Sequence, residues 1–125
     1  MSYTTERRNK NRGYMQLVVW QKAVELFELI WKIAFVDAKI DLRLRSQLTD
    51  AAQSVSANIA EGYGRQATGE YRHHLLICRG SLLELETQLL LCRRLKYSSE
   101  QEIDPLLTEI TEISKMLGSL IAKLS

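Results

Sequence analysis

Steps of three and four residues alternate between apolar positions throughout residues 70–95, and this constrains the fold more than any other feature. The spacing is that of heptad positions a and d, which lie on one face of an α-helix. A helix with such a seam buries it against other helices, so the segment predicts helical packing rather than a sheet. The seam consists of Leu75, Cys78, Leu82, Leu85, Leu89 and Cys92.

Three further segments repeat this periodicity, at about residues 17–36, 42–61 and 100–124. Asp41 is a suitable N-cap for the second of them, and Ser99 with Glu102 matches a capping box before the third. Four helices of similar length with short connections predict an all-α, antiparallel up-and-down four-helix bundle. In the first segment the expected buried line is Trp20, Val24, Phe27, Trp31 and Ala34, widened by Ala23 and Ile30.

Length and composition agree with one globular domain of 125 residues, 46% hydrophobic and 26% charged. We expect a basic, mobile N-terminal arm at residues 1–16 and the bundle at residues 17–125. The start has no signal-peptide core, and no apolar run is long enough to span a membrane. Cys78 and Cys92 would lie about 21 Å apart on one helix, too far for a disulfide. Reduced thiols indicate a cytoplasmic protein.

The stretch SANIAEGYGR, residues 56–65, raises the question of a phosphate-binding loop. Such a loop follows a strand and opens a helix, whereas Gly62 and Gly64 follow a helix. Gly62 is therefore interpreted as the residue after the helix, in a left-handed conformation. Asn58 is expected to use polar groups of this turn as partners, and Glu61 could pair with Arg65 or with a neighbouring chain.

A second apolar ridge lies off the seam of residues 70–95. A helix needs one apolar face to pack inside its own bundle, and a further solvated ridge of leucines is unusual on a soluble monomer. The ridge therefore predicts self-association through a contact between copies. The expected interface residues are Leu76, Leu83 and Leu90, with Ile77 and Leu91 beside them.

Catalytic and metal chemistry find little support in the sequence. Glu70, His74 and Cys78 share a helix face, but a structural zinc site needs a fourth ligand, and Cys78 belongs to the seam. Neither cysteine has an activating base nearby in sequence. The chain is expected to have no enzymatic activity, no metal and no cofactor.

Basic residues offer two interpretations that the sequence leaves open. They could contact nucleic-acid phosphates, or they could pair with acids of a neighbouring subunit. Net charge is only +2, but the first twelve residues are strongly basic. The candidates are Arg7, Arg8, Lys10, Arg12, Arg43, Arg45, Arg65, Arg72, Arg79, Arg93, Arg94 and Lys96.

Three segments together resemble the four helix bundle proteins, also called 23S rRNA-intervening sequence proteins. They are LVVWQKAVELFELIW, AAQSVSANIAEGYGR and GSLLELETQLLL, within a similarity that spans residues 17–124. The most specific part is Ala57-Asn58-Ile59-Ala60-Glu61-Gly62. Three positions depart from the family pattern: Ser56 replaces a usual proline, and Thr49-Asp50 replaces two arginines.

The resemblance implies a small bacterial protein without enzymatic activity that assembles into a ring-shaped homopentamer. The family is related to accessory variability proteins of diversity-generating retroelements, which bind a reverse transcriptase and nucleic acid. We therefore expect a homo-oligomeric scaffold that binds RNA or a ribonucleoprotein. The alternatives are an accessory protein for a partner such as a reverse transcriptase and a purely structural assembly, and a nucleic-acid partner could be RNA or DNA.

Overall fold

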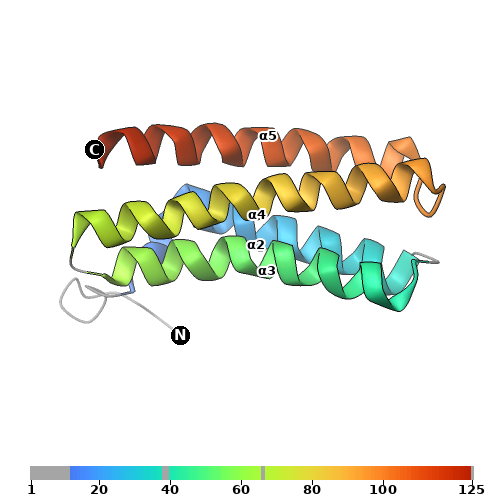
Figure 1. The fold of residues 1–125 in the computed structure, drawn as a ribbon, viewed down its shortest axis with the longest axis horizontal. Coiled ribbons are helices and arrows are strands. Elements are labelled where there is room, and N and C mark those ends of the chain that lie inside the picture. Colours follow the sequence, from blue (N-terminus) through green and yellow to red (C-terminus); the bar gives the residue numbers. More distant parts are fainter. Residues whose placement is uncertain (1–11, 38–39, 66, 125) are drawn as a thin grey trace.

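Four long helices run side by side along the molecule and alternate in direction (Figure 1). The computed structural model describes residues 12–37, 40–65 and 67–124, and within them there is no strand. The expectation of an all-α fold with four helices is confirmed. The helices are α2 (Val18–Trp31), α3 (Leu42–Gly64), α4 (Thr68–Arg94) and α5 (Glu100–Lys123), with a 3-10 helix at Gly13–Gln16 and a π-helical turn at Lys32–Asp37.

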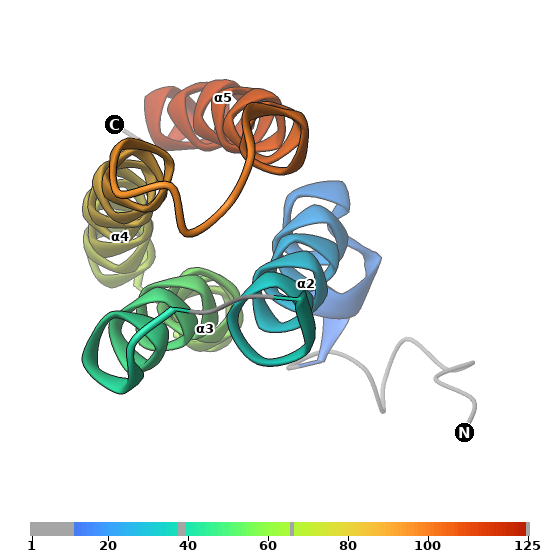
Figure 2. The ribbon, with the colours of Figure 1, turned by 90° about the vertical axis from the view of Figure 1, so that its right-hand side faces the viewer.

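Each helix packs mainly on its neighbours in the sequence, and α5 closes the bundle by packing on α2. Viewed end-on, α2 and α4 are therefore diagonal, and the α2–α3 and α4–α5 pairs form opposite faces (Figure 2). The packing of α3 on α4 is the most extensive. Lys22 links α2 to α5 through ion pairs with Glu109 (3.3 Å) and Glu112 (3.1 Å).

The core contains the whole predicted seam of α4, every member of which is fully buried. The predicted line on α2 is partly wrong. Ala23, Ile30 and Ala34 are buried as predicted, but Trp31 is exposed, and Val19 and Leu26 are buried in place of the predicted aromatic residues. Both rows of residues are apolar and both follow three- and four-residue steps, so periodicity alone does not indicate which row is buried. The larger predicted residues, Phe27 and Trp31, lie at the edge of the core or are exposed.

The helix starts follow the expected capping chemistry. The Asp41 side chain accepts a hydrogen bond from the Leu44 amide at 2.9 Å, and Ser99 with Glu102 forms a full capping box. Pro105 lies inside α5, as its sixth residue.

Gly62 does not have the conformation that the sequence suggested. It lies inside α3, two residues before the helix ends at Gly64, and no described glycine has a positive φ. A Cβ atom at Gly62 would lie 2.7 Å from His74 Cβ and 3.1 Å from Tyr71 Cδ1. The absence of a side chain therefore allows α4 to approach α3 closely, which is a second reason for a glycine in a helix.

Asn58 also differs from expectation, because its partners are helical residues rather than the turn. Its Nδ2 donates to the Ser54 carbonyl oxygen at 2.9 Å, and its Oδ1 lies 2.9 Å from His74 Nδ1 on α4. Glu61 pairs with Arg65 at 3.1 Å within the chain, one of the two pairings considered. The residues of SANIAEGYGR thus build the contact between α3 and α4.

The expected arm at residues 1–16 is described only from Arg12 onward, and residues 1–11 lie outside the described part. Gly13–Gln16 forms the 3-10 helix, which packs on α2 and α3. Tyr14 meets Trp20 edge to face, with ring centroids 5.2 Å apart. Within the described ranges, every helix is too short or too polar to cross a membrane.

Candidate assembly and nucleic-acid interfaces

Leu83 is the most exposed apolar side chain along α4, with 61% of its surface accessible. Leu83 lies on the flank of α4 nearest α5. The ridge to which it belongs runs beside Arg93, and Arg93 pairs with Asp104 of α5. Leu76 and Leu90, two turns to either side, are half-buried, and Leu76 packs against the core. The predicted ridge of three solvated leucines is thus reduced to Leu83 at its centre.

Ile77 and Leu91 lie on the other flank of α4. They are 37% and 45% exposed, and they follow the helical row of Ser81, whose hydroxyl donates to Ser54 of α3. These two residues therefore belong to a different surface from Leu83. The five expected interface residues do not form one continuous strip.

The side of α2 that faces α3 carries an aromatic strip of Phe27, Trp31 and Phe35, of which Phe27 and Trp31 were expected in the core. Trp31 stacks between Phe27 and Phe35, with centroid distances of 6.0 and 4.2 Å. Trp31 is 47% exposed and Phe35 41%. The Arg45 guanidinium of α3 lies 5.1 Å from the Phe35 ring centroid, a cation–π distance. Phe27, Glu28 and Trp31 line a shallow hollow of about 420 Å³.

Several of the candidate phosphate-binding cations are engaged within the chain, among them Arg93, Arg65 and Arg45. Arg93 binds Asp104 at 2.7 Å and Arg65 binds Glu61 at 3.1 Å. Arg45 donates to the Ile40 carbonyl oxygen at 2.9 Å while it covers Phe35. An anion at any of these positions would compete with an existing partner.

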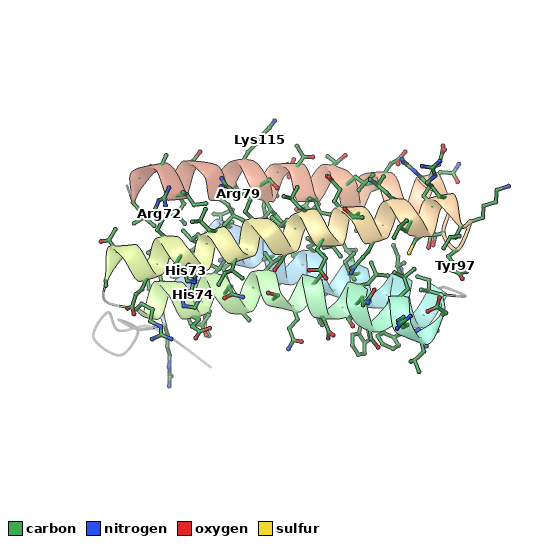
Figure 3. All side chains as sticks on the ribbon, in the orientation of Figure 1. Arg72, His73, His74, Arg79, Tyr97 and Lys115 are labelled. Atoms are coloured by element: carbon green, nitrogen blue, oxygen red, sulfur yellow. The ribbon has the colours of Figure 1, made fainter. Side chains whose placement is uncertain are left out.

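Arg72 and Arg79 project from α4 toward α5, and Lys115 projects outward from α5 (Figure 3). Arg72 is half-buried, and its buried Nε has no hydrogen-bond partner among the described residues. Residues 71–83 of α4 and 113–124 of α5 contain no aspartate or glutamate. Lys115 was missed as a candidate, although the acid-free second half of α5 is visible in the sequence.

A second group of cations lies at the other end of the bundle. Arg94 and Lys96 end α4, and Arg43 begins α3 at the same end; all three are exposed. Tyr97, half-buried beside Lys96, supplies an aromatic ring at this end (Figure 3). The length of α4 separates this group from Arg72 by about 30 Å, so the predicted basic residues form two surfaces rather than one. Arg7, Arg8 and Lys10 lie outside the described residues.

Both thiols are buried, as the seam predicted. Burial raises the pKa of Cys78 to about 12 and that of Cys92 to about 11. The Cys78 thiol donates to the Val55 carbonyl oxygen at 3.3 Å, and His74 is bonded to Asn58. Among the described residues, no three His, Cys, Asp or Glu side chains come together as a metal-ion site.

The chain is similar to a known protein family and to a solved structure. Residues 15–119 match the model of a family described as 23S rRNA-intervening sequence protein. The crystal structure of a protein with unknown function from the S23 ribosomal protein family of Bacteroides thetaiotaomicron is similar, with a TM-score of 0.77 and 27% identity. The match covers 83% of this chain and 98% of the other. No curated protein matches the chain.

Proposed function

Because the chain belongs to the 23S rRNA-intervening sequence protein family, we propose that it is a non-enzymatic scaffold that self-associates and binds RNA. The observation that carries self-association is the large apolar side chains that one copy leaves in water. Leu83 is 61% exposed at the centre of a 27-residue helix, and Trp31 and Phe35 are 47% and 41% exposed, so a contact between copies would cover apolar surface. The family resemblance favours a ring of five copies.

RNA binding is supported by the exposed cations at the end of α4. Arg94 and Lys96 have no carboxylate partner in the described part of the chain. Arg43 lies at the same end, and the half-buried Tyr97 lines the same hollow as Lys96, together with Glu100 and Glu102. Cations with an adjacent aromatic ring fit single-stranded nucleic acid, which offers both phosphates and bases. An assembly would carry several copies of this end, and an RNA that contacts several of them would bind more tightly than one that contacts a single copy.

The proposal is tested by measuring RNA binding and mass on the same purified protein. We expect a labelled single-stranded RNA to bind in 50 mM salt and to lose most of its affinity by 200 mM salt. Light scattering is expected to give a mass several times the 14.4 kDa of one chain. Undetectable binding at low salt would remove the RNA role, and a monomeric mass would remove the scaffold.

A further inference from the structure

We infer that the hollow at the turn between α4 and α5 binds a guanine base of single-stranded RNA. The inference rests on the RNA binding proposed above and names the base that this end of the bundle prefers. The hollow measures about 380 Å³, within the range of small-ligand sites, about 300–1,000 Å³. Its lining includes Lys96 and Tyr97 of the turn, and Glu100 and Glu102 of the first turn of α5.

Some polar groups of the hollow are already occupied, and others are free. Arg93 is held by its ion pair with α5. One carboxylate oxygen of Glu102 accepts from the amide and the hydroxyl of Ser99, at 3.1 and 3.2 Å. Within the described ranges, the side chains of Lys96 and Glu100 have no ion pair and no hydrogen bond. The hollow therefore offers a ligand one free cation and one free carboxylate.

The buried Ser98 side chain also lacks a partner. Ser98 lines the hollow and is 7% exposed, and its hydroxyl makes no hydrogen bond in the part of the chain that the structure describes. Buried polar groups of proteins are normally hydrogen-bonded. A polar group of a ligand in the hollow would supply the missing partner.

The backbone of Lys96 indicates that its side chain is needed. Its φ is 61°, a left-handed conformation that no other described residue adopts. The turn is closed by two hydrogen bonds, in which the Tyr97 amide donates to the Cys92 carbonyl oxygen at 2.9 Å and the Lys96 amide to that of Arg93 at 3.1 Å. Glycine is the usual residue at this position, because it has no Cβ atom. A lysine weakens the turn, so its ammonium group serves a ligand rather than the fold.

The carboxylates decide which ligand fits. Glu100 and Glu102 repel a bare phosphate, whereas a carboxylate accepts hydrogen bonds from the edge of a base. Guanine presents N1–H and its N2 amino group side by side, so that both donate to one carboxylate as a bidentate pair. Uracil, cytosine and adenine each place an acceptor next to their donor, and that acceptor would face the carboxylate.

Each free group of the hollow then has a role. Glu100 accepts the two donors of guanine, because its carboxylate is unoccupied. Tyr97, which lies at this turn (Figure 3), is half-buried and offers a ring on which a base stacks. Lys96 binds the adjacent phosphate.

Base substitution in the RNA tests the inference on the wild-type protein. The probes are a labelled oligouridine and the same RNA with spaced guanosines, inosines or adenosines, measured by fluorescence anisotropy at low salt. The guanosine RNA is expected to bind about tenfold more tightly than oligouridine, the discrimination of one bidentate pair. Inosine keeps N1–H but lacks the amino group, so its RNA is expected to lose most of this advantage. The adenosine RNA is expected to lack it.

Three variants locate the preference in the hollow. Glu100→Gln is expected to abolish the preference for guanosine and to keep oligouridine binding. Glu70→Gln, the matched control, removes the same charge at an exposed position at the start of α4 and is expected to keep the preference. Lys96→Gly is expected to weaken the binding of every probe and to raise the urea midpoint of unfolding, because glycine suits the left-handed conformation.

The outcomes separate this inference from the proposed function. Equal, salt-dependent affinity for the guanosine RNA and oligouridine would overturn the inference and leave RNA binding intact. An adenosine RNA that binds as tightly as the guanosine RNA would also overturn it, as would an undiminished preference in Glu100→Gln. A wild-type protein that binds none of the probes would overturn both proposals.

Discussion

His74 donates from Nδ1 to Oδ1 of Asn58 over 2.9 Å, across the contact between α3 and α4. The direction follows from Asn58, whose Nδ2 already donates to Ser54, so that its oxygen faces the imidazole. Ser81 of α4 donates to the Ser54 hydroxyl at 3.0 Å and extends the polar line. In an otherwise apolar contact, such a line fixes the axial register of one helix on the other.

Removal of either partner should destabilise the fold and reveal their coupling. Asn58→Ala and His74→Ala are each expected to lower the free energy of unfolding by about 1–2 kcal/mol, because a half-buried polar group loses its partner. The double variant should lose less than the sum, with a coupling of about 0.5–1.5 kcal/mol. Urea unfolding at one protein concentration measures this cycle, and strictly additive losses would contradict the assigned bond.

Gly62→Ala should destabilise the protein although alanine favours helices. The added methyl would lie 2.7 Å from His74 Cβ, an atom fixed by the helix backbone, so α3 and α4 must separate. Overpacking of this kind costs about 1–3 kcal/mol. Gly80→Ala is the matched control, since a methyl group there would have no neighbour within 4 Å, and it should stabilise by about 0.5–1 kcal/mol. A more stable Gly62→Ala variant would refute the close approach.

The buried thiols should resist modification in the folded protein. With pKa values of about 12 and 11, Cys78 and Cys92 carry almost no thiolate at pH 8, and the thiolate is the reactive form. We expect a disulfide reagent to titrate no thiol of the native chain within minutes and two thiols in denaturant. Rapid modification of the native chain would contradict their burial.

The same thiols should weaken the fold in alkali. The folded pKa of Cys78 lies above its ordinary value of 9.0, so the unfolded chain loses this proton first. Its contribution to stability is complete below pH 9 and is lost as the pH rises toward about 12. The urea midpoint should therefore fall above pH 9, and Cys78→Ala should show a smaller fall than wild type.

RNA affinity should depend on the end of the bundle that carries Arg94 and Lys96. Arg94→Glu/Lys96→Glu is expected to lower affinity and to reduce the salt slope by about 0.7 for each lost phosphate contact. Lys115→Glu/Lys123→Glu makes the same change in net charge elsewhere and should bind more tightly than the first variant. Equal losses in fluorescence anisotropy would indicate a general charge effect without a defined site.

Much of this fold could be predicted from the sequence because heptad spacing and capping chemistry are local signals. The α4 seam, the Asp41 cap and the Ser99–Glu102 capping box are all present as expected. Local signals do not decide between two apolar rows on one helix. The orientation of α2, which exposes Trp31 and buries Leu26, depends on which residues α3 and α5 bring against it.

The candidate surfaces were less predictable, because exposure and pairing depend on contacts between distant segments. Leu76 and Leu83 share a helical row, but packing half-buries one and leaves the other in water. Arg93 looks free in the sequence until α5 brings Asp104 to it. Gly62 matches the usual sequence signal for a helix end. Its close contact with α4 can be recognised only when His74 is known to lie opposite it.

Sedimentation of wild type beside Leu83→Glu tests the central claim most directly. The account predicts a wild-type mass several times that of one chain and a monomeric Leu83→Glu protein with unchanged helicity. Gln53→Glu, which adds the same charge at an exposed position of α3, away from Leu83, should keep the wild-type mass. A Leu83→Glu protein with the full wild-type mass, or a wild-type protein that sediments as a monomer, would contradict the account.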